Sequence, residues 1–329
     1  MKNKWKMHGL MGLLLLGQTM LSWADYSGHT DARAVVNELV EEEGLDSDVL
    51  LAILKQAEKR QSILDAISRP AEKTLTWERY RNIFIQKKRI QDGAAFYKKH
   101  AKVLQAAEDK FGVPKEIIVS IIGVETLYGK NTGSYRVIDA LSTLAFDYPK
   151  RSPFFRSELK HFLILTSAQG KDPLTFKGSY AGAMGLGQFM PSSYRAYAAE
   201  YGTDGFIDIW EDPQDAIWSV ANYLRKHGWQ RDQSITRPVT LAGDFNEELI
   251  SSALKPALSA EQLVVGGVEI SEKEIVSDAT LMALDGVDGK EYWLGWDNFY
   301  VITRYNHSAL YAMAVFQLAE GIQAEAAGD

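Results

Sequence analysis

Apolar residues recur at three- and four-residue spacing over most of this chain, which is 329 residues long. That spacing is typical of amphipathic helices, and it runs through 31–111 and again from 114 to about 229. A glycine-rich stretch at 178–187 interrupts the second run and predicts a loop. The pattern therefore predicts a mainly α-helical protein.

Between 230 and 297 the pattern changes to short strand-like runs. The runs at 280–284 and 292–294 flank a turn rich in glycine and aspartate, which is typical of a β-hairpin, and a third run lies at 239–241. Helical spacing returns at 308–321. This return indicates that the chain re-enters the domain that it left.

These changes divide the chain into five predicted parts. They are a leader at 1–24, a helical domain at 25–112, a core region at 113–229, a small mixed α/β insertion at 230–297, and a return to the core with a C-terminal tail at 298–329. We find no internal repeat and no low-complexity tract.

The leader has the three-part layout of a secretory signal. Three lysines precede a leucine-rich run at 10–21, and a cleavage site follows at Ala24. The run is shorter than the roughly 20 apolar residues that a membrane helix needs, and glycines interrupt it. We therefore expect export with cleavage after Ala24, and no membrane span elsewhere.

Composition narrows the chemistry further. The chain has no cysteine, which excludes disulfides, thiolate metal sites, a cysteine nucleophile and a lipid-attachment cysteine. Its formal charge of −7 falls to −10 without the three leader lysines. A general attraction to nucleic acid or to an anionic membrane surface is therefore not expected.

Glu125 is a carboxylate on the apolar face of a predicted helix. Pro114 suits the first turn of that helix, and Gly129 suits the cap after its last turn. Burial on this face would favour the protonated form that a general acid needs. The alternative is a structural ion pair at a helix end. The neighbours that share the face are Ile118, Ile121 and Ile122.

Ser179 and Gln188 lie in and beside the glycine-rich loop, which follows neither a dinucleotide fingerprint nor a Walker loop. Their neutral polar groups suit a sugar hydroxyl or an N-acetyl group. An aromatic ring with a polar edge suits a sugar ring, as Tyr223, Tyr305 and Tyr311 could provide. The alternative is a tight packing corner with tyrosines in the core.

A stretch that begins at Glu200 follows a calcium-loop template in part. Asp204, Asp208 and Glu211 occupy its fifth, ninth and twelfth positions. Glu200 replaces the usual first Asp, however, and Gly202 offers no ligand at the third position. The stretch is either a structural calcium site or a solvated turn, and we expect no required cofactor.

Four motifs, in this order, resemble the lytic murein transglycosylase B family. They are Gly-Val-Glu-Thr at 123–126 with Tyr-Gly at 128–129, Ser-Tyr-Ala-Gly-Ala-Met-Gly at 179–185 with Gly-Gln-Phe-Met-Pro-Ser-Ser-Tyr at 187–194, Ser-Val-Ala-Asn-Tyr at 219–223 and Arg-Tyr-Asn-His-Ser at 304–308. Shorter matches at 76–77, 80–81 and 144–149 extend the resemblance over nearly the whole chain after the leader. The resemblance implies a lysozyme-like catalytic core, an N-terminal helical domain and a small β-containing insertion.

The resemblance also implies roles for single residues. Glu125 would be the catalytic acid and base, and Tyr311 would be an aromatic near the cleft. The family can carry a calcium loop after the glycine-rich motif. Its members commonly carry a lipid-attached cysteine, which this chain lacks, so we expect a soluble periplasmic form. Saccharide contacts would come from Ser179, Gln188, Tyr223, Tyr305 and Asn306.

The implied activity is cleavage of the β-1,4 bond between N-acetylmuramic acid and N-acetylglucosamine in peptidoglycan glycan strands. Glu125 would protonate the glycosidic oxygen and then take the proton of the muramic C6 hydroxyl, which leaves a 1,6-anhydro end. One carboxylate suffices because the substrate supplies the nucleophile, whereas ordinary glycosidases use two. Other cell-wall enzymes are candidate partners.

Two other functions stay open at this point. A lysozyme-type muramidase, which is a hydrolase, would need a second carboxylate, for which Asp139, Asp147 and Glu158 are candidates. A non-catalytic peptidoglycan-binding protein would hold glycan strands without cutting them. Binding alone does not need a buried acid, so the presence of Glu125 on an apolar face favours the hypothesis of an enzyme over that of a binding protein.

Overall fold

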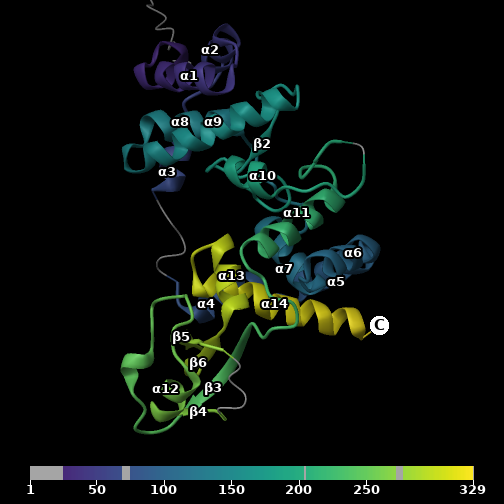
Figure 1. The fold of residues 1–329 in the computed structure, drawn as a ribbon, viewed down its shortest axis with the longest axis vertical. Coiled ribbons are helices and arrows are strands. Elements are labelled where there is room, and N and C mark those ends of the chain that lie inside the picture. Colours follow the sequence, from purple (N-terminus) through teal and green to yellow (C-terminus); the bar gives the residue numbers. More distant parts are fainter. Residues whose placement is uncertain (1–24, 69–74, 204, 272–276, 329) are drawn as a thin grey trace, which may run out of the picture.

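The structure, a computed structural model, describes residues 25–68, 75–203, 205–271 and 277–328. The predicted leader at 1–24 and Asp204 of the predicted calcium loop lie outside these residues. The described part is mainly α-helical, as the sequence predicts, and none of its helices is long and apolar enough to cross a membrane. Figure 1 shows the elements stacked in three tiers along one long axis.

The first tier is built around α8 (Val137–Asp147) and α9 (Ser152–Ala168), which pack against each other. The 3-10 turn Pro149–Arg151 joins them. N-terminal elements complete the tier, with α1 packed on α9 and α3 packed on α8. They are the 3-10 turn Tyr26–Gly28, α1 (Thr30–Glu43), α2 (Ser47–Lys55) and α3 (Gln61–Ile67).

The middle tier surrounds α7 (Lys115–Thr126), whose apolar side chains are buried. Four helices contact it, and the last of them comes from the C-terminal end of the chain. The predicted return of the chain at 308–321 therefore brings a helix back onto α7. The four are α5 (Lys87–Lys99), α6 (Ala101–Phe111), α11 (Pro213–Lys226) and α14 (Ala309–Ala327).

Three shorter helices connect these parts. α4 (Trp77–Phe84) and α13 (Asp297–Tyr305) pack on α14, and α10 (Pro191–Tyr197) packs between α9 and α11. Helices α1 to α3 thus pack in the first tier, whereas α4 to α6 pack in the middle tier (Figure 1). The domain boundaries given above stay a prediction.

The glycine-rich stretch is a compact turn. β1 (Tyr135–Arg136) and β2 (Lys177–Gly178) pair antiparallel, and the chain after β2 folds back through bridges from Met184 to Gly178 and to Phe189. A Cβ atom at Gly178 would lie 2.2 Å from the carbonyl oxygen of Ala183. Only glycine permits this approach of main chain to main chain.

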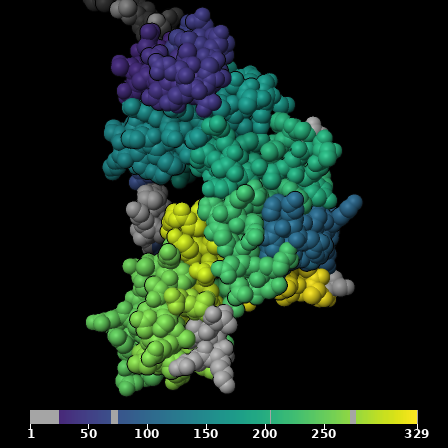
Figure 2. Space-filling model, viewed as in Figure 1, coloured from purple at the N-terminus to yellow at the C-terminus, as the bar shows by residue number. Residues whose placement is uncertain are grey.

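Between α11 and α13 the chain forms a four-stranded sheet in the order β4-β3-β6-β5, and β5 and β6 make the predicted hairpin. Its elements are β3 (Thr236–Leu241), the 3-10 turn Glu247–Leu249, α12 (Ala260–Val265), β4 (Val268–Glu269), β5 (Thr280–Gly286) and β6 (Gly289–Gly295). Figure 2 shows this segment as a lobe at one end of the molecule. The lobe has its own buried cluster of Leu263, Val268, Ala279, Leu281, Leu294 and Trp296.

Ser120→Ala tests the contact between α7 and α14. The buried Ser120 hydroxyl donates to the main-chain carbonyl of Val315 at 2.6 Å. We expect the free energy of unfolding to fall by about 1 kcal/mol, since a buried hydrogen bond is worth about that much. Urea denaturation measures the change, with Ser157→Ala at an exposed position of α9 as control. Equal effects of the two substitutions would contradict this role.

Candidate active site

Glu125 lies in the last turn of α7, where this helix meets α14. The Tyr311 hydroxyl donates a hydrogen bond to Glu125 Oε1 at 2.7 Å. Glu125 is only partly buried, so a ligand can reach part of its side chain. The predicted apolar face is correct, because its other members are each 0% exposed: Ile118, Ile121 and Ile122.

Tyr311 comes from the first turn of α14, 186 residues further along the chain. The side chain of Ser308 caps this helix by accepting from the Tyr311 amide at 3.3 Å. Tyr311 is 2% exposed. Burial, together with the negative charge of Glu125, raises the pKa of Tyr311 well above its usual value. Its hydroxyl therefore keeps its proton at neutral pH and stays a donor to Glu125.

Tyr305 and Tyr223 extend from Tyr311 as a row of rings. The Tyr305 and Tyr311 rings are stacked, with 10° between their planes and 6.4 Å between centroids, and the Tyr223 and Tyr305 centroids lie 4.7 Å apart. The Tyr305 hydroxyl donates to the Gly187 carbonyl at 2.6 Å, and the Tyr223 hydroxyl donates to the Arg304 carbonyl at 2.6 Å. The row therefore joins the glycine-rich loop to Glu125.

Gln188 lies at the far side of that loop in the left-handed backbone region, with φ of 50°. Its Nε2 donates to the carbonyls of Gly185 at 2.9 Å and of Thr132 at 3.2 Å. Both amide hydrogens are thus used, and the side chain presents Oε1 as an acceptor.

Ser179 and Asn306 occupy turns beside this row. The Ser179 Oγ accepts from the amides of Ala181 at 3.3 Å and Ala183 at 3.1 Å, so it shapes the glycine-rich turn. Asn306 caps the C-terminal end of α13, directly after Tyr305. Its main-chain carbonyl accepts a hydrogen bond from the Ser308 amide at 2.7 Å. Each of these residues thus supports the backbone near the predicted sugar contacts.

The two ends of α7 differ from the sequence-based prediction. Pro114 is the residue before the helix rather than part of its first turn, and the helix ends at Thr126. Leu127 and Tyr128 then adopt left-handed backbone, with φ of 53° and 60°. That conformation costs roughly 1 kcal/mol or more for a residue with a Cβ atom. The predicted cap at Gly129 is wrong, because surrounding contacts turn the chain earlier.

Close packing holds Tyr128 in this conformation. A Cβ atom at Gly123 would lie 2.6 Å from the Tyr128 ring, and one at Gly93 would lie 2.5 Å from its hydroxyl oxygen. That hydroxyl donates to the Arg89 carbonyl at 2.8 Å, and Arg89 Nη1 donates to the Gly123 carbonyl at 2.9 Å. These contacts fix the end of α7, and with it Glu125, from the side of α5.

Thr126 fixes the same helix end from the side of the glycine-rich loop. Its buried hydroxyl lies within hydrogen-bond distance of the carbonyls of Leu186, at 2.9 Å, and Ile122, at 3.1 Å, and accepts from the Gly129 amide at 3.1 Å. The sequence did not reveal the roles of Thr126 and Arg89, although Thr126 stands next to Glu125. Both act through contacts with distant segments, which spacing alone does not predict.

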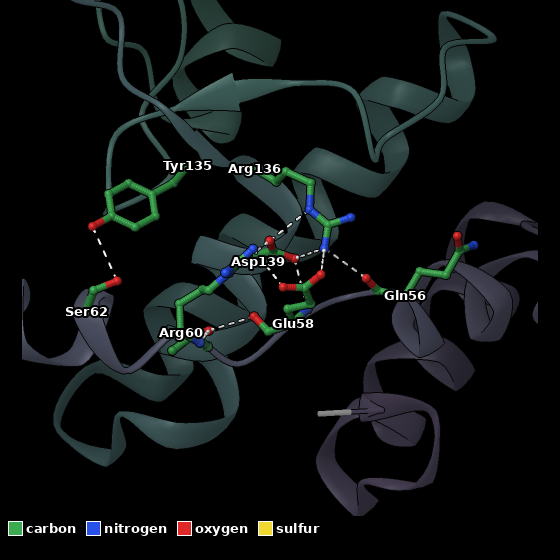
Figure 3. A network of polar contacts seen from close by, with 8 residues as sticks. Gln56, Glu58, Arg60, Ser62, Tyr135, Arg136 and Asp139 are labelled. Carbon is green, nitrogen blue, oxygen red and sulfur yellow. Dashed lines mark hydrogen bonds and ion pairs between the residues drawn. The ribbon is translucent and has the colours of Figure 1, made fainter. Parts of the chain in front are cut away.

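Asp139, one candidate for a second catalytic carboxylate, lies in a structural network (Figure 3). It is 1% exposed, and Arg136 donates to both of its oxygens at 2.8 Å. The Glu58 amide donates to Oδ1 at 2.8 Å, and Arg60 Nε lies 3.6 Å from Oδ2. Figure 3 shows the segment that carries Glu58 and Arg60 facing Asp139. This carboxylate joins the N-terminal segment to α8.

Asp147 and Glu158 have similar structural partners. Asp147 accepts from the Tyr26 hydroxyl at 2.6 Å and pairs with Lys59. Glu158 is 3% exposed and accepts from the amide and hydroxyl of Ser192 at 2.9 Å and 2.7 Å. Both carboxylates therefore hold elements of the fold together.

Carboxylates in the predicted calcium loop accept hydrogen bonds from main-chain amides of the same loop. Asp208 Oδ1 accepts from the amides of Trp210 and Glu211, both at 2.9 Å, and Glu200 Oε1 accepts from the Gly205 amide at 2.9 Å. In the described part of the chain no three acidic or histidine side chains converge as metal ligands, and Asp204 lies outside that part.

Comparison with known proteins identifies the family. Residues 28–320 match the family model described as the transglycosylase SLT domain. The chain belongs to this family. It is 40% identical over 323 residues to membrane-bound lytic murein transglycosylase B of Escherichia coli (strain K12), which covers 94% of this chain and 88% of that protein. The resemblance found in the sequence and the predicted enzyme class, lytic transglycosylase, are confirmed.

Three solved structures resemble this chain. Soluble lytic transglycosylase SltB1 from Pseudomonas aeruginosa has a TM-score of 0.85 and 50% identity, over 91% of this chain and 100% of its own. Lytic transglycosylase Slt35 from Escherichia coli, in complex with calcium, has a TM-score of 0.84 and 40% identity, over 92% of this chain and 96% of its own. SltB3 from Pseudomonas aeruginosa, in complex with NAG-anhNAM-pentapeptide, has a TM-score of 0.78 and 29% identity, over 88% of this chain and 78% of its own. The predicted fold, mainly α with a lysozyme-like core, is confirmed.

Thr126→Val should weaken both stability and catalysis. The change leaves the Gly129 amide and the Leu186 carbonyl without this partner, so we expect the free energy of unfolding to fall by about 1–3 kcal/mol. Displacement of the helix end should lower kcat/KM by roughly tenfold or more, because catalysis is sensitive to such shifts. Urea denaturation and steady-state kinetics measure the two effects.

Thr166→Val is the matched control for that variant. Thr166 is also buried, but among the described residues its hydroxyl bonds only within its own helix, to the carbonyls of Phe162 at 3.0 Å and Leu163 at 3.2 Å. We expect little change in kcat/KM. An equal loss of activity in the two variants would show that the contact of Thr126 with the loop has no particular role.

Proposed function

We propose that the protein cleaves the β-1,4 bond between N-acetylmuramic acid and N-acetylglucosamine in peptidoglycan strands and leaves a 1,6-anhydro-muramic acid end. Glu125 donates a proton to the glycosidic oxygen as that bond breaks. The resulting carboxylate then takes the proton of the muramic C6 hydroxyl, whose oxygen bonds to the anomeric carbon. No water is added, so the reaction is that of a lyase.

The hydrogen bond from Tyr311 to Glu125 is the observation that carries this proposal. A group that acts first as acid and then as base must stay in place while its proton leaves and returns. The Tyr311 hydroxyl can donate to Oε1 whether or not Glu125 is protonated, and it keeps its own proton because its pKa is raised. Proton transfer then falls to Oε2.

The other candidate carboxylates support a mechanism with one acid. A hydrolase would need a second carboxylate to activate water or to form a covalent intermediate. Asp139, Asp147 and Glu158 are instead engaged by arginine, lysine, tyrosine or serine partners that hold the fold together. In the proposed reaction the C6 hydroxyl replaces the water, and the acetamide of the substrate stabilises the oxocarbenium-like centre.

Sugar binding is proposed along the row of tyrosine rings and the glycine-rich loop. The Tyr305 hydroxyl is already used on a main-chain carbonyl, so this partly exposed residue offers ring surface to a sugar. Tyr223 is 8% exposed and would act mainly by packing against the Tyr305 ring. Gln188 offers Oε1 as an acceptor for a hydroxyl or amide hydrogen. Ser179 and Asn306 complete the proposed set of saccharide contacts.

The proposed location is the periplasm, on the strength of the leader layout at 1–24 and the lack of a lipid-attachment cysteine. Other cell-wall enzymes are proposed partners there. No catalytic step needs a metal, and the hydrogen-bonded loop around Asp208 is proposed to hold its shape without calcium.

Glu125→Gln tests the reaction directly. We expect turnover of purified sacculi to fall by roughly 10²–10⁴-fold, since the amide cannot shuttle the proton. Mass spectrometry of the released muropeptides should show 1,6-anhydro ends with the wild type only. Glu116→Gln, in the first turn of the same helix, is the control and should keep its activity. Wild-type products that are heavier by one water would identify a hydrolase, and no products would favour a binding protein.

Tyr311→Phe should move the pH dependence of kcat. A hydrogen bond donated to a carboxylate favours its charged form, so its loss favours protonated Glu125. The alkaline limb of the profile should therefore shift upward by up to about one pH unit, which corresponds to about 1.4 kcal/mol. Tyr223→Phe removes a hydroxyl whose one hydrogen bond among the described residues goes to the Arg304 carbonyl, and it should leave that limb in place. A shift in both variants would contradict the role of Tyr311.

A further inference from the structure

The row of rings that starts at Tyr311 continues beyond Tyr223 to His227. The imidazole ring of His227 is stacked on the Tyr223 ring, with 4.0 Å between the two centroids and 25° between the planes. The Tyr197 ring, which comes from α10, has its centroid 4.8 Å from that of His227 and 5.0 Å from that of Tyr223. Among the histidines of the described chain, His227 is the one whose ring contacts this row. It is half-buried, so it can exchange protons with solvent.

A hydrogen bond determines which ring nitrogen of His227 carries the proton of the neutral form. Nδ1 lies 2.8 Å from the main-chain carbonyl oxygen of Tyr223, one helical turn earlier in α11. A carbonyl oxygen can only accept, so Nδ1 is the donor and Nε2 keeps a lone pair. A second proton therefore binds at Nε2, and it turns the ring into an imidazolium without breaking the bond to Tyr223.

The surroundings of His227 set the pH at which that second proton binds. Arg304, in the last turn of α13, brings a positive charge near the ring, whereas α10 and α11 bring the phenol rings of Tyr197 and Tyr223. Burial and, to a smaller extent, the charge of Arg304 hold the pKa of His227 below its usual value, although the bond to the Tyr223 carbonyl raises it. The ring is therefore neutral at pH 7 and gains a charge on acidification. The charged residues directly before it in α11 are exposed to solvent: Arg225 and Lys226.

Arg304 connects His227 to the proposed sugar site. Its main-chain carbonyl accepts the Tyr223 hydroxyl at 2.6 Å, and it directly precedes Tyr305 in α13. Tyr305 is the partly exposed ring that is proposed to face the sugar, and its centroid lies 4.7 Å from that of Tyr223. An imidazolium at His227 would repel the Arg304 guanidinium, because both carry a positive charge. The repulsion would displace the end of α13, and Tyr305 with it.

We propose that His227 is a positioning residue for the row of tyrosine rings and that its protonation weakens sugar binding, an inference that rests on the function proposed above. The neutral imidazole packs on Tyr223 and leaves Arg304 in place. The charged ring keeps its contact with Tyr223 but adds a like charge near the end of α13. The proton of His227 thus acts mainly through KM, whereas the proton of Glu125 acts through kcat, so the two titrations can be separated.

Steady-state kinetics on soluble glycan strands test this assignment in the intact enzyme. We expect the KM of the wild type to rise roughly threefold from about pH 7 to about pH 5, the modest size that a partly solvated pair of like charges produces. His227→Asn keeps a donor near the position of Nδ1 but cannot titrate, so its KM should stay constant within about 1.5-fold. His100→Asn is the control, because His100 also has a lowered pKa but packs on Phe96 in α5, and it should keep the wild-type dependence. An equal rise of KM in the wild type and in His227→Asn would overturn the proposal.

Arg304→Gln separates the charge of this residue from its main-chain contact. The substitution removes the guanidinium and keeps the carbonyl that accepts the Tyr223 hydroxyl. We expect the pKa of His227 to move up toward its usual value, since one cause of its lowering is gone. The rise of KM on acidification should shrink to less than about 1.5-fold, because the like charge is absent. An undiminished rise would contradict the route through Arg304.

A binding measurement keeps the test independent of catalysis and of changes at His227. The imidazole of His227 is titrated by NMR in Glu125→Gln, with and without a saturating trimer of N-acetylglucosamine. If protonation weakens sugar binding about threefold, bound sugar must lower the pKa of His227 by about 0.5, because the coupling between two binding events is reciprocal. An unchanged or raised pKa in the presence of the sugar would overturn the proposal. Failure of the proposed reaction would appear separately, as wild-type products without anhydro ends.

Discussion

The hydrogen bond between Tyr311 and Glu125 is the interaction on which the site depends. It joins the end of one buried helix to the beginning of another across 186 residues of sequence. It can form only because α14 returns to pack along α7, where Ser120 also bonds to the Val315 carbonyl. The core of the middle tier thus sets the distance between the Tyr311 hydroxyl and the Glu125 carboxylate. A substitution that shifts α14 against α7 would therefore also change this distance.

Backbone strain is concentrated beside this bond. The left-handed residues other than glycine in the described chain are Leu127, Tyr128, Gln188 and Asp232, and three of these four flank the site. Such conformations persist only where neighbouring contacts stabilise them. Here the hydroxyls of Tyr128 and Thr126, and the two glycines under the Tyr128 ring, supply those contacts. The rigidity of the end of α7 comes from its surroundings rather than from helix capping.

The sequence predicted correctly those features that depend on residues close together in the chain. Periodicity indicated the helical regions, the β5–β6 hairpin and the face that carries Glu125, because each follows from residues that are near in sequence. The cap at Gly129 was predicted wrongly, since tertiary contacts override the local preference for glycine. The bonds of Arg89 and Thr126 were not predictable from spacing. Tyr311 was a candidate for a sugar contact, but its hydrogen bond to Glu125 depends on the packing of distant helices.

The separation of α7 and α14 by 186 residues of sequence has a consequence for the order in which the site is assembled. A ribosome completes α7, with Glu125, long before it reaches the 19 residues of α14. Until then α7 lacks both the hydroxyl of Tyr311 and the apolar side chains that cover it. A chain that stops before α14 therefore lacks the donor at Glu125 as well as the helix that packs along α7, so the geometry around this carboxylate exists only once both helices are present.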